Sequence, residues 1–101
     1  MLEDAVKLKL NITYSEPDTD ARISGITQMA DAVLRDALGI DDASFTFETP
    51  GQEQALFLDF CFYEFNDALD DFYINYAEQM AQARNRWMVK QFVKEQEAAD
   101  V

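Results

Sequence analysis

The chain has 101 residues and a net charge of −12, and 49% of its residues are hydrophobic and 13% aromatic. This length and apolar content predict a single domain with a packed core and exclude a disordered chain. A surface this acidic repels phosphate groups and disfavours conventional nucleic-acid binding. The sequence contains no histidine, so it lacks the usual general base of enzymes and the commonest zinc ligand.

The apolar patterns predict an all-α fold, a small bundle of about four helices in one domain that spans residues 1–101. We expect the first helix over residues 2–10, where Glu3 and Asp4 suit a helix N-terminus, although residues 8–14 also alternate like a strand. A polar loop follows. Apolar residues then recur every three or four positions and predict a helix from Thr19 to Leu38, with Asp18 or Thr19 as its cap and Gly39 as its stop.

Residues 40–52 are expected to form a loop or a short strand arm, with Phe45 and Phe47 folded back onto the core. We place one helix at about residues 53–66 and a long C-terminal helix from Asp67 to about Glu97. The tail at residues 95–101 is polar and is expected to fray. One face of the long helix is expected to be apolar, with Leu69, Phe72, Tyr73, Tyr76, Met80, Ala83 and Trp87.

Residues 55–72 carry the densest aromatic content of the chain together with acids and no base. Their aromatic side chains point around much of a helix cylinder, so this helix is either central in one subunit or covered by a neighbouring one. Core packing is the default interpretation. A base-stacking platform also needs a basic groove, and the surrounding acids argue against it.

All eight basic residues lie outside residues 36–83, a block that holds eleven acids. Arg84, Arg86, Lys90 and Lys94 then follow within eleven residues that contain no acid. Cations late in a helix are favourable by themselves, which is the simplest explanation of the cluster. The alternative is a contact of this basic end with an acidic surface of another subunit or partner, and such head-to-tail contacts can close into rings.

The residues offer little catalytic chemistry. The carboxylates of Glu64, Asp67, Asp70 and Asp71 have a spacing that can hold a divalent cation, but a hydrated acidic surface explains them more simply. Cys61, the only cysteine, lies among aromatic residues without a nearby base and is interpreted as a small buried hydrophobe. We therefore expect no enzyme activity, no cofactor and no metal.

No secretory signal or membrane-spanning segment is visible, so we expect synthesis and use in a cytoplasm without membrane contact.

A resemblance to a known family extends over nearly the whole chain and rests on hydrophobic patterns. The segments that carry it are Asn11-Ile12, Asp20-Ala21-Arg22-Ile23, Ala37-Leu38-Gly39-Ile40, residues 55–72, and Asn75-Tyr76-Ala77-Glu78 before a closing helix. In this order and spacing the chain resembles the small head-tail connector proteins of long-tailed bacteriophages, also called adaptor or head-completion proteins.

The resemblance implies a structural virion protein, assembled in the host cytoplasm, that forms a ring of copies of itself beneath the portal protein. The ring would extend the DNA channel, let DNA pass without specific binding, and receive a stopper or tail-completion protein. Portal or subunit docking would fall to the end of the last helix, with Arg84, Arg86, Trp87, Met88, Lys90, Phe92 and Lys94. An acidic lining would keep DNA from adhering, and the candidate channel-facing acids are Asp41, Asp42, Glu48, Asp67, Asp70 and Asp71.

Two other functions fit parts of the sequence. The acid-only block suits a DNA mimic that inhibits a DNA-binding enzyme, but the basic cluster adds nothing to such a mimic. A helical protein-protein adaptor that forms no ring is the other alternative.

Overall fold

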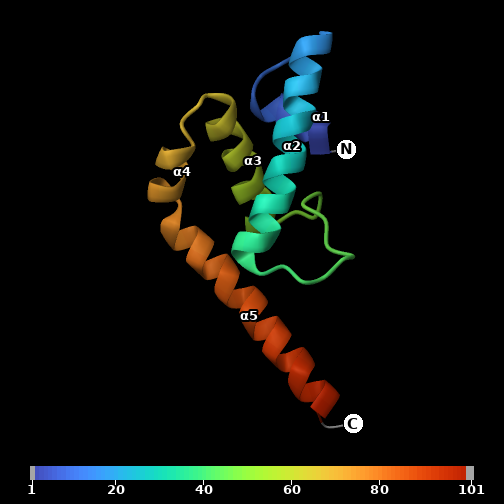
Figure 1. Cartoon of the computed structure of the whole chain (residues 1–101), viewed down its shortest axis with the longest axis vertical. Coiled ribbons are helices and arrows are strands. Elements are labelled where there is room, and N and C mark those ends of the chain that lie inside the picture. Colours follow the sequence, from blue (N-terminus) through green and yellow to red (C-terminus); the bar gives the residue numbers. More distant parts are fainter. Residues whose placement is uncertain (1, 100–101) are drawn as a thin grey trace.

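The computed structural model describes residues 2–99, and these residues form five α-helices and no strand. The helices are α1 (Leu2–Lys9), α2 (Pro17–Leu38), α3 (Gln52–Phe65), α4 (Leu69–Asn75) and α5 (Ala77–Ala99) (Figure 1). The all-α class and the small bundle with a long C-terminal helix are thus confirmed. The molecule measures 54 × 27 × 18 Å because α5 extends well beyond the other helices (Figure 1). None of these helices combines the length and the apolar character needed to cross a membrane.

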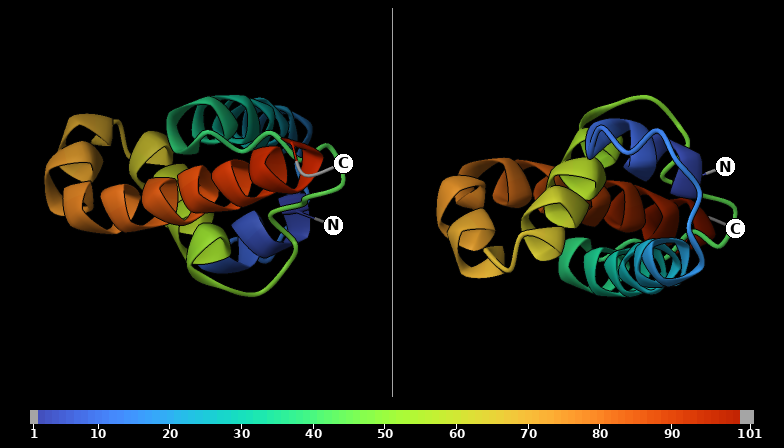
Figure 2. Two further views of the ribbon diagram at one scale, coloured as in Figure 1. Left: turned by 90° about the horizontal axis from the view of Figure 1, so that it is seen from below. Right: turned by 90° about the horizontal axis from the view of Figure 1, so that it is seen from above.

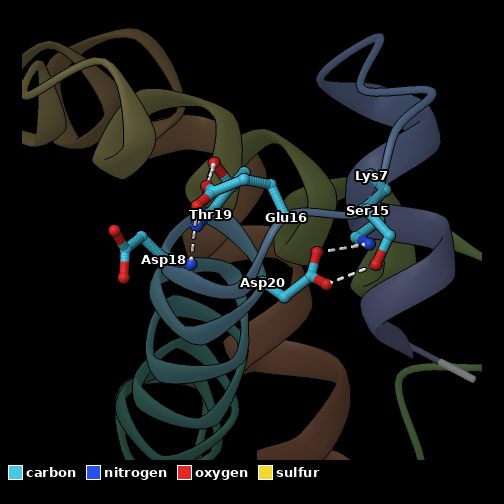
Figure 3. Close-up of polar contacts among 6 residues, drawn as sticks. All are labelled: Lys7, Ser15, Glu16, Asp18, Thr19 and Asp20. Carbon is cyan, nitrogen blue, oxygen red and sulfur yellow. Dashed lines mark hydrogen bonds and ion pairs between the residues drawn. The ribbon is translucent and has the colours of Figure 1, made fainter.

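The start of α2 lies before the predicted position because a different residue caps it. The carboxylate of Glu16 accepts hydrogen bonds from the backbone N–H groups of Asp18 (3.2 Å) and Thr19 (2.9 Å) (Figure 3). These bonds satisfy two donors that the first turn would otherwise leave free, so the helix begins at Pro17. Its end at Leu38 is as predicted, since Gly39 adopts the left-handed conformation with φ of 68°.

A charged contact joins α1 to the beginning of α2 (Figure 3). The carboxylate of Asp20 lies 2.6 Å from the Nζ of Lys7 and accepts a hydrogen bond of 2.6 Å from the Ser15 hydroxyl. These two partners, Lys7 first, lower the pKa of Asp20 below its usual value. The contact therefore stabilises the fold at neutral pH and is lost as the pH falls through the lowered pKa.

Helix α3 is the centre of the bundle and contacts each of the other four helices (Figure 2). Phe57, Phe60 and Cys61 on this helix are fully buried. Phe65 is half-buried beneath the guanidinium of Arg22, which lies 4.2 Å from the centre of its ring. Phe62 alone among the phenylalanines of α3 is exposed. The phenylalanines of this helix other than Phe62 therefore pack within a single subunit and leave little aromatic surface for a neighbouring one.

The prediction of one continuous helix from Asp67 to Glu97 is wrong, because the chain bends at Tyr76 between α4 and α5 (Figure 1). The bend lets α4 pack against α3, so that Phe72 is fully buried with its ring 5.3 Å from the ring of Phe60. The ring of Tyr76 stacks on that of Phe72 at 5.0 Å. Stacking at the bend thus fixes the direction in which α5 leaves the bundle.

The segment between α2 and α3, residues 40–51, is a loop, and the alternative of a short strand arm is wrong for it. Both phenylalanines fold back as predicted, with Phe47 fully buried and its ring stacked 4.9 Å from that of Phe57. The guanidinium of Arg35 donates hydrogen bonds to the backbone carbonyls of Asp42 and Phe45. The loop is therefore tied to α2 and to the core at several points and has no need of a strand partner.

Candidate functional site

The last part of α5 forms a projection, here called the C-terminal arm and defined as residues 84–99 (Figure 1). Helix α5 continues through Glu95 to Ala99, and residues 100 and 101 lie outside the described part of the chain. The fraying expected from Glu95 stays a prediction. Trp87 was predicted to dock outward, but only 7% of it is exposed. Its indole packs edge-on at 5.1 Å against the ring of Phe45 in the loop. Trp87 therefore anchors the arm to its own subunit.

Two of the four cations in the arm contact groups of their own subunit, and a third, Lys94, lies close enough to the loop for its charge to act on Asp42. Arg86 lies 2.8 Å from the carboxylate of Glu53 and donates a hydrogen bond to Gln52. The ammonium of Lys90 lies 4.3 Å from the centre of the Trp87 ring. Lys90 and Lys94 also line a groove together with Asp41 and Asp42 of the loop. These contacts make a structural role sufficient for Arg86, Lys90 and Lys94.

Arg84 differs from the other cations of the arm. It is exposed and makes no hydrogen bond, ion pair or ring contact with any residue in the described part of the chain. Met88 lies four positions after it, so the two side chains are neighbours on the helix surface. Arg84 is therefore the cation of the arm that is available to a partner.

A second apolar stripe covers the side of the arm that faces away from the bundle. At 3.6 residues per turn, Val89 and Phe92 lie about 160° and 140° around the helix from Trp87. Phe92 is 59% exposed, and its apolar neighbours are exposed as well. This outer face consists of Met88, Val89, Phe92 and Val93. Packing within the subunit explains the inner face of the arm but leaves the outer face uncovered.

The six acids predicted to face a channel are all exposed, but they lie on two separate surfaces. Asp41, Asp42 and Glu48 belong to the 40–51 loop, whereas Asp67, Asp70 and Asp71 lie where α3 turns into α4, on the other side of the molecule (Figures 1 and 2). Asp42 accepts hydrogen bonds from the backbone N–H and the hydroxyl of Ser44, at 2.9 and 2.6 Å. These bonds, followed by the charges of Lys94 and Lys90, lower its pKa.

The α3–α4 turn forms an acidic corner, defined here by Glu64, Asp67, Asp70 and Asp71. These four side chains line one groove together with Ala68 and Leu69, and no cation lines it. Across residues 2–99, no group of three or more Asp, Glu or Cys side chains is placed to hold a metal ion. On the adjoining turn of α4, Ile74 is 75% exposed and Tyr73 is also exposed. The corner thus combines negative charge with an uncovered apolar edge.

The Cys61 thiol is buried, and its pKa is raised to about 12, first by burial and then by the charge of Glu64. Because the native state keeps this thiol protonated, its contribution to stability is complete below the unfolded pKa near 9 and decreases as the pH rises from there toward 12. We expect thiol reagents to label Cys61 in denaturant but not in the native protein at pH 8. We also expect the free energy of unfolding to decline above pH 9, and to decline less in Cys61→Ala. Rapid labelling of the native protein would contradict this placement of the side chain.

Sequence reasoning missed Val89, Val93 and Ile74 as exposed apolar residues. The signal for the first two was present, because Met88, Val89, Phe92 and Val93 follow the spacing i, i+1, i+4, i+5 and therefore share a helix face opposite to Trp87. The exposure of Ile74 depends on the bend at Tyr76, and the local sequence gave no sign of that bend.

Comparison of the chain with models of protein families, with curated proteins and with solved structures finds no match.

Proposed function

We propose that this chain is a structural virion protein that forms a ring beneath the portal of a long-tailed bacteriophage and joins the head to the tail or to a stopper. The observation that carries the proposal is the uncovered outer face of the C-terminal arm. A helix that buries Trp87 on one side and exposes Phe92 on the other is suited to hold a second protein. Neither an enzyme activity nor a cofactor is part of the proposal.

The distribution of acids supports a channel role for part of the surface. DNA passing through a ring must not adhere, and carboxylates on the wall repel its phosphates. The exposed acids of the 40–51 loop and of the acidic corner are the candidates for this wall. Passage of DNA through such a ring requires no base-specific contact.

A DNA mimic is supported less well. Mimicry requires carboxylates arrayed along one surface, whereas the six acids proposed for the channel wall are divided between the 40–51 loop and the α3–α4 turn, and other exposed acids lie on α1, α2 and α5. The groove at Asp41 and Asp42 also contains Lys90 and Lys94, which offset the negative charge there. An adaptor that forms no ring would use the same arm, so the ring itself is the feature to test.

The proposal is tested by electron microscopy of the portal protein of the same virus mixed with this chain. We expect a closed ring of additional density on the tail-facing side of the portal. A portal that remains bare at saturating concentrations of the chain would overturn the proposal. A DNA mimic would instead compete with DNA for a DNA-binding enzyme, and a simple adaptor would bind the portal without forming a closed ring.

A further inference from the structure

We propose that the outer face of the C-terminal arm docks on the acidic corner and the exposed edge of α4 in a second copy of this chain. The inference rests on the proposed function and deepens it by naming both sides of the contact between subunits.

The arm supplies an apolar face with a cation at its edge. Met88, Val89, Phe92 and Val93 are uncovered in the subunit, and Arg84 lies one helical turn before Met88. Arg84 has no partner within residues 2–99, whereas Arg86 is held by Glu53. A surface that receives the arm must therefore offer both apolar contacts and a carboxylate.

The acidic corner and α4 offer this combination. Ile74 and Tyr73 are exposed on α4, and the carboxylates of Asp70 and Asp71 lie within one turn of them on the same helix. The groove at the corner is lined by four carboxylates and by no cation. Docking of the arm would cover the apolar edge and bring Arg84 to carboxylates that have no cationic neighbour in that groove.

The geometry excludes this contact within one subunit and favours a second copy. The corner lies beside the beginning of α5 and the outer face lies near its end (Figure 1). Ala77 and Phe92 are separated by about 22 Å along a straight helix axis, at 1.5 Å per residue. The two complementary surfaces are different patches of the same chain. A contact between two copies therefore leaves the arm of one copy and the acidic corner of the other copy free to bind further copies. Such heterologous contacts repeat and close into a ring when the rotation permits.

The inference also separates the roles of the two acidic surfaces. Asp67, Asp70 and Asp71 would lie at the contact between subunits and would be unavailable to the channel. Asp41, Asp42 and Glu48 would then be the acids left for the channel wall.

The test is disulfide cross-linking between two single-site variants of the full chain, Val93→Cys and Ile74→Cys. The native Cys61 is buried and does not interfere. We call the disulfide between the cysteine introduced at position 93 of one copy and that at position 74 of another the 93–74 disulfide, and the one with a cysteine at position 8 in place of position 74 the 93–8 disulfide. We expect the yield of the 93–74 disulfide to exceed that of the 93–8 disulfide about tenfold or more, because docking raises the local concentration of one thiol at the other. The control, Leu8→Cys, places a highly exposed thiol on α1, away from both surfaces.

A charge exchange provides the second readout. Arg84→Glu should reduce the 93–74 yield about tenfold, and Asp70→Arg with Asp71→Arg in the other subunit should restore it. A predominance of 93–93 disulfides would overturn the inference and indicate symmetric pairing of two arms. A 93–74 yield equal to the control would also overturn it.

Both experiments are run with the free chain at high concentration and with rings assembled on the portal. Rings that form on the portal without the 93–74 disulfide would refute this inference alone. The disulfide without any ring on the portal would refute the proposed function and leave the contact between copies intact.

Discussion

Phe47→Ala is expected to lower the free energy of unfolding by about 3–5 kcal/mol. Phe47 is fully buried, stacks on Phe57 and meets the ring of Phe45 edge-on at 5.2 Å. Alanine would leave a cavity at the point where the loop joins the core. Domains of this size are typically stable by only about 5–15 kcal/mol, so much of the stability depends on this side chain.

Equilibrium denaturation followed by circular dichroism measures the effect of Phe47→Ala. Thr49→Ala in the same loop is the matched control, because Thr49 is exposed and its side chain makes no hydrogen bond within the described residues. We expect the control to change stability by less than about 0.5 kcal/mol. Equal stability of the two variants would show that the loop is not anchored by Phe47. The groove formed by Asp42, Lys90 and Trp87 would then lose its structural basis.

The sequence was sufficient to predict a helix boundary or a core residue where one local signal dominated. The three- and four-residue spacing of apolar residues and the stop at Gly39 located the end of α2, and the two loop phenylalanines were correctly assigned to the core. The bend at Tyr76 was not predictable in this way. No proline or glycine marks it, and it is stabilised by the rings of Phe60 and Phe72, which meet only in the folded chain. The cap at Glu16 was missed because Asp18 and Thr19 are more usual capping residues.

The docking residues that the family resemblance implies differ in how the structure places them. Met88 and Phe92 were identified as docking residues, and the structure leaves both exposed. Arg86 was assigned to the same surface but pairs with Glu53, which lies 33 positions earlier in the sequence. Ion pairs between residues so distant along the chain depend on how α3 and α5 pack, and the sequence of the basic cluster contains no information about that packing.

Replacing Met88 and Phe92 together by glutamine is expected to abolish the proposed ring assembly on the portal while leaving the subunit folded. Both side chains are exposed in the subunit, and glutamine has a helix propensity close to that of methionine. We therefore expect the free energy of unfolding to change by less than about 0.5 kcal/mol. Loss of the two largest side chains of the outer face should nevertheless eliminate most of the apolar area that the arm can bury against a partner.

Denaturation measures the stability of the Met88→Gln, Phe92→Gln variant, and electron microscopy of portal complexes measures its assembly. Asn85→Gln is the control, because it lies on the same side of α5 and changes no apolar area; it should assemble normally. Trp87→Ala marks the opposite case, a change on the inner side of the same helix that should destabilise the subunit by about 3–5 kcal/mol. If the double glutamine variant assembled as well as the control, Met88 and Phe92 would have no part in binding, and the contact would have to involve Arg84 without these two side chains.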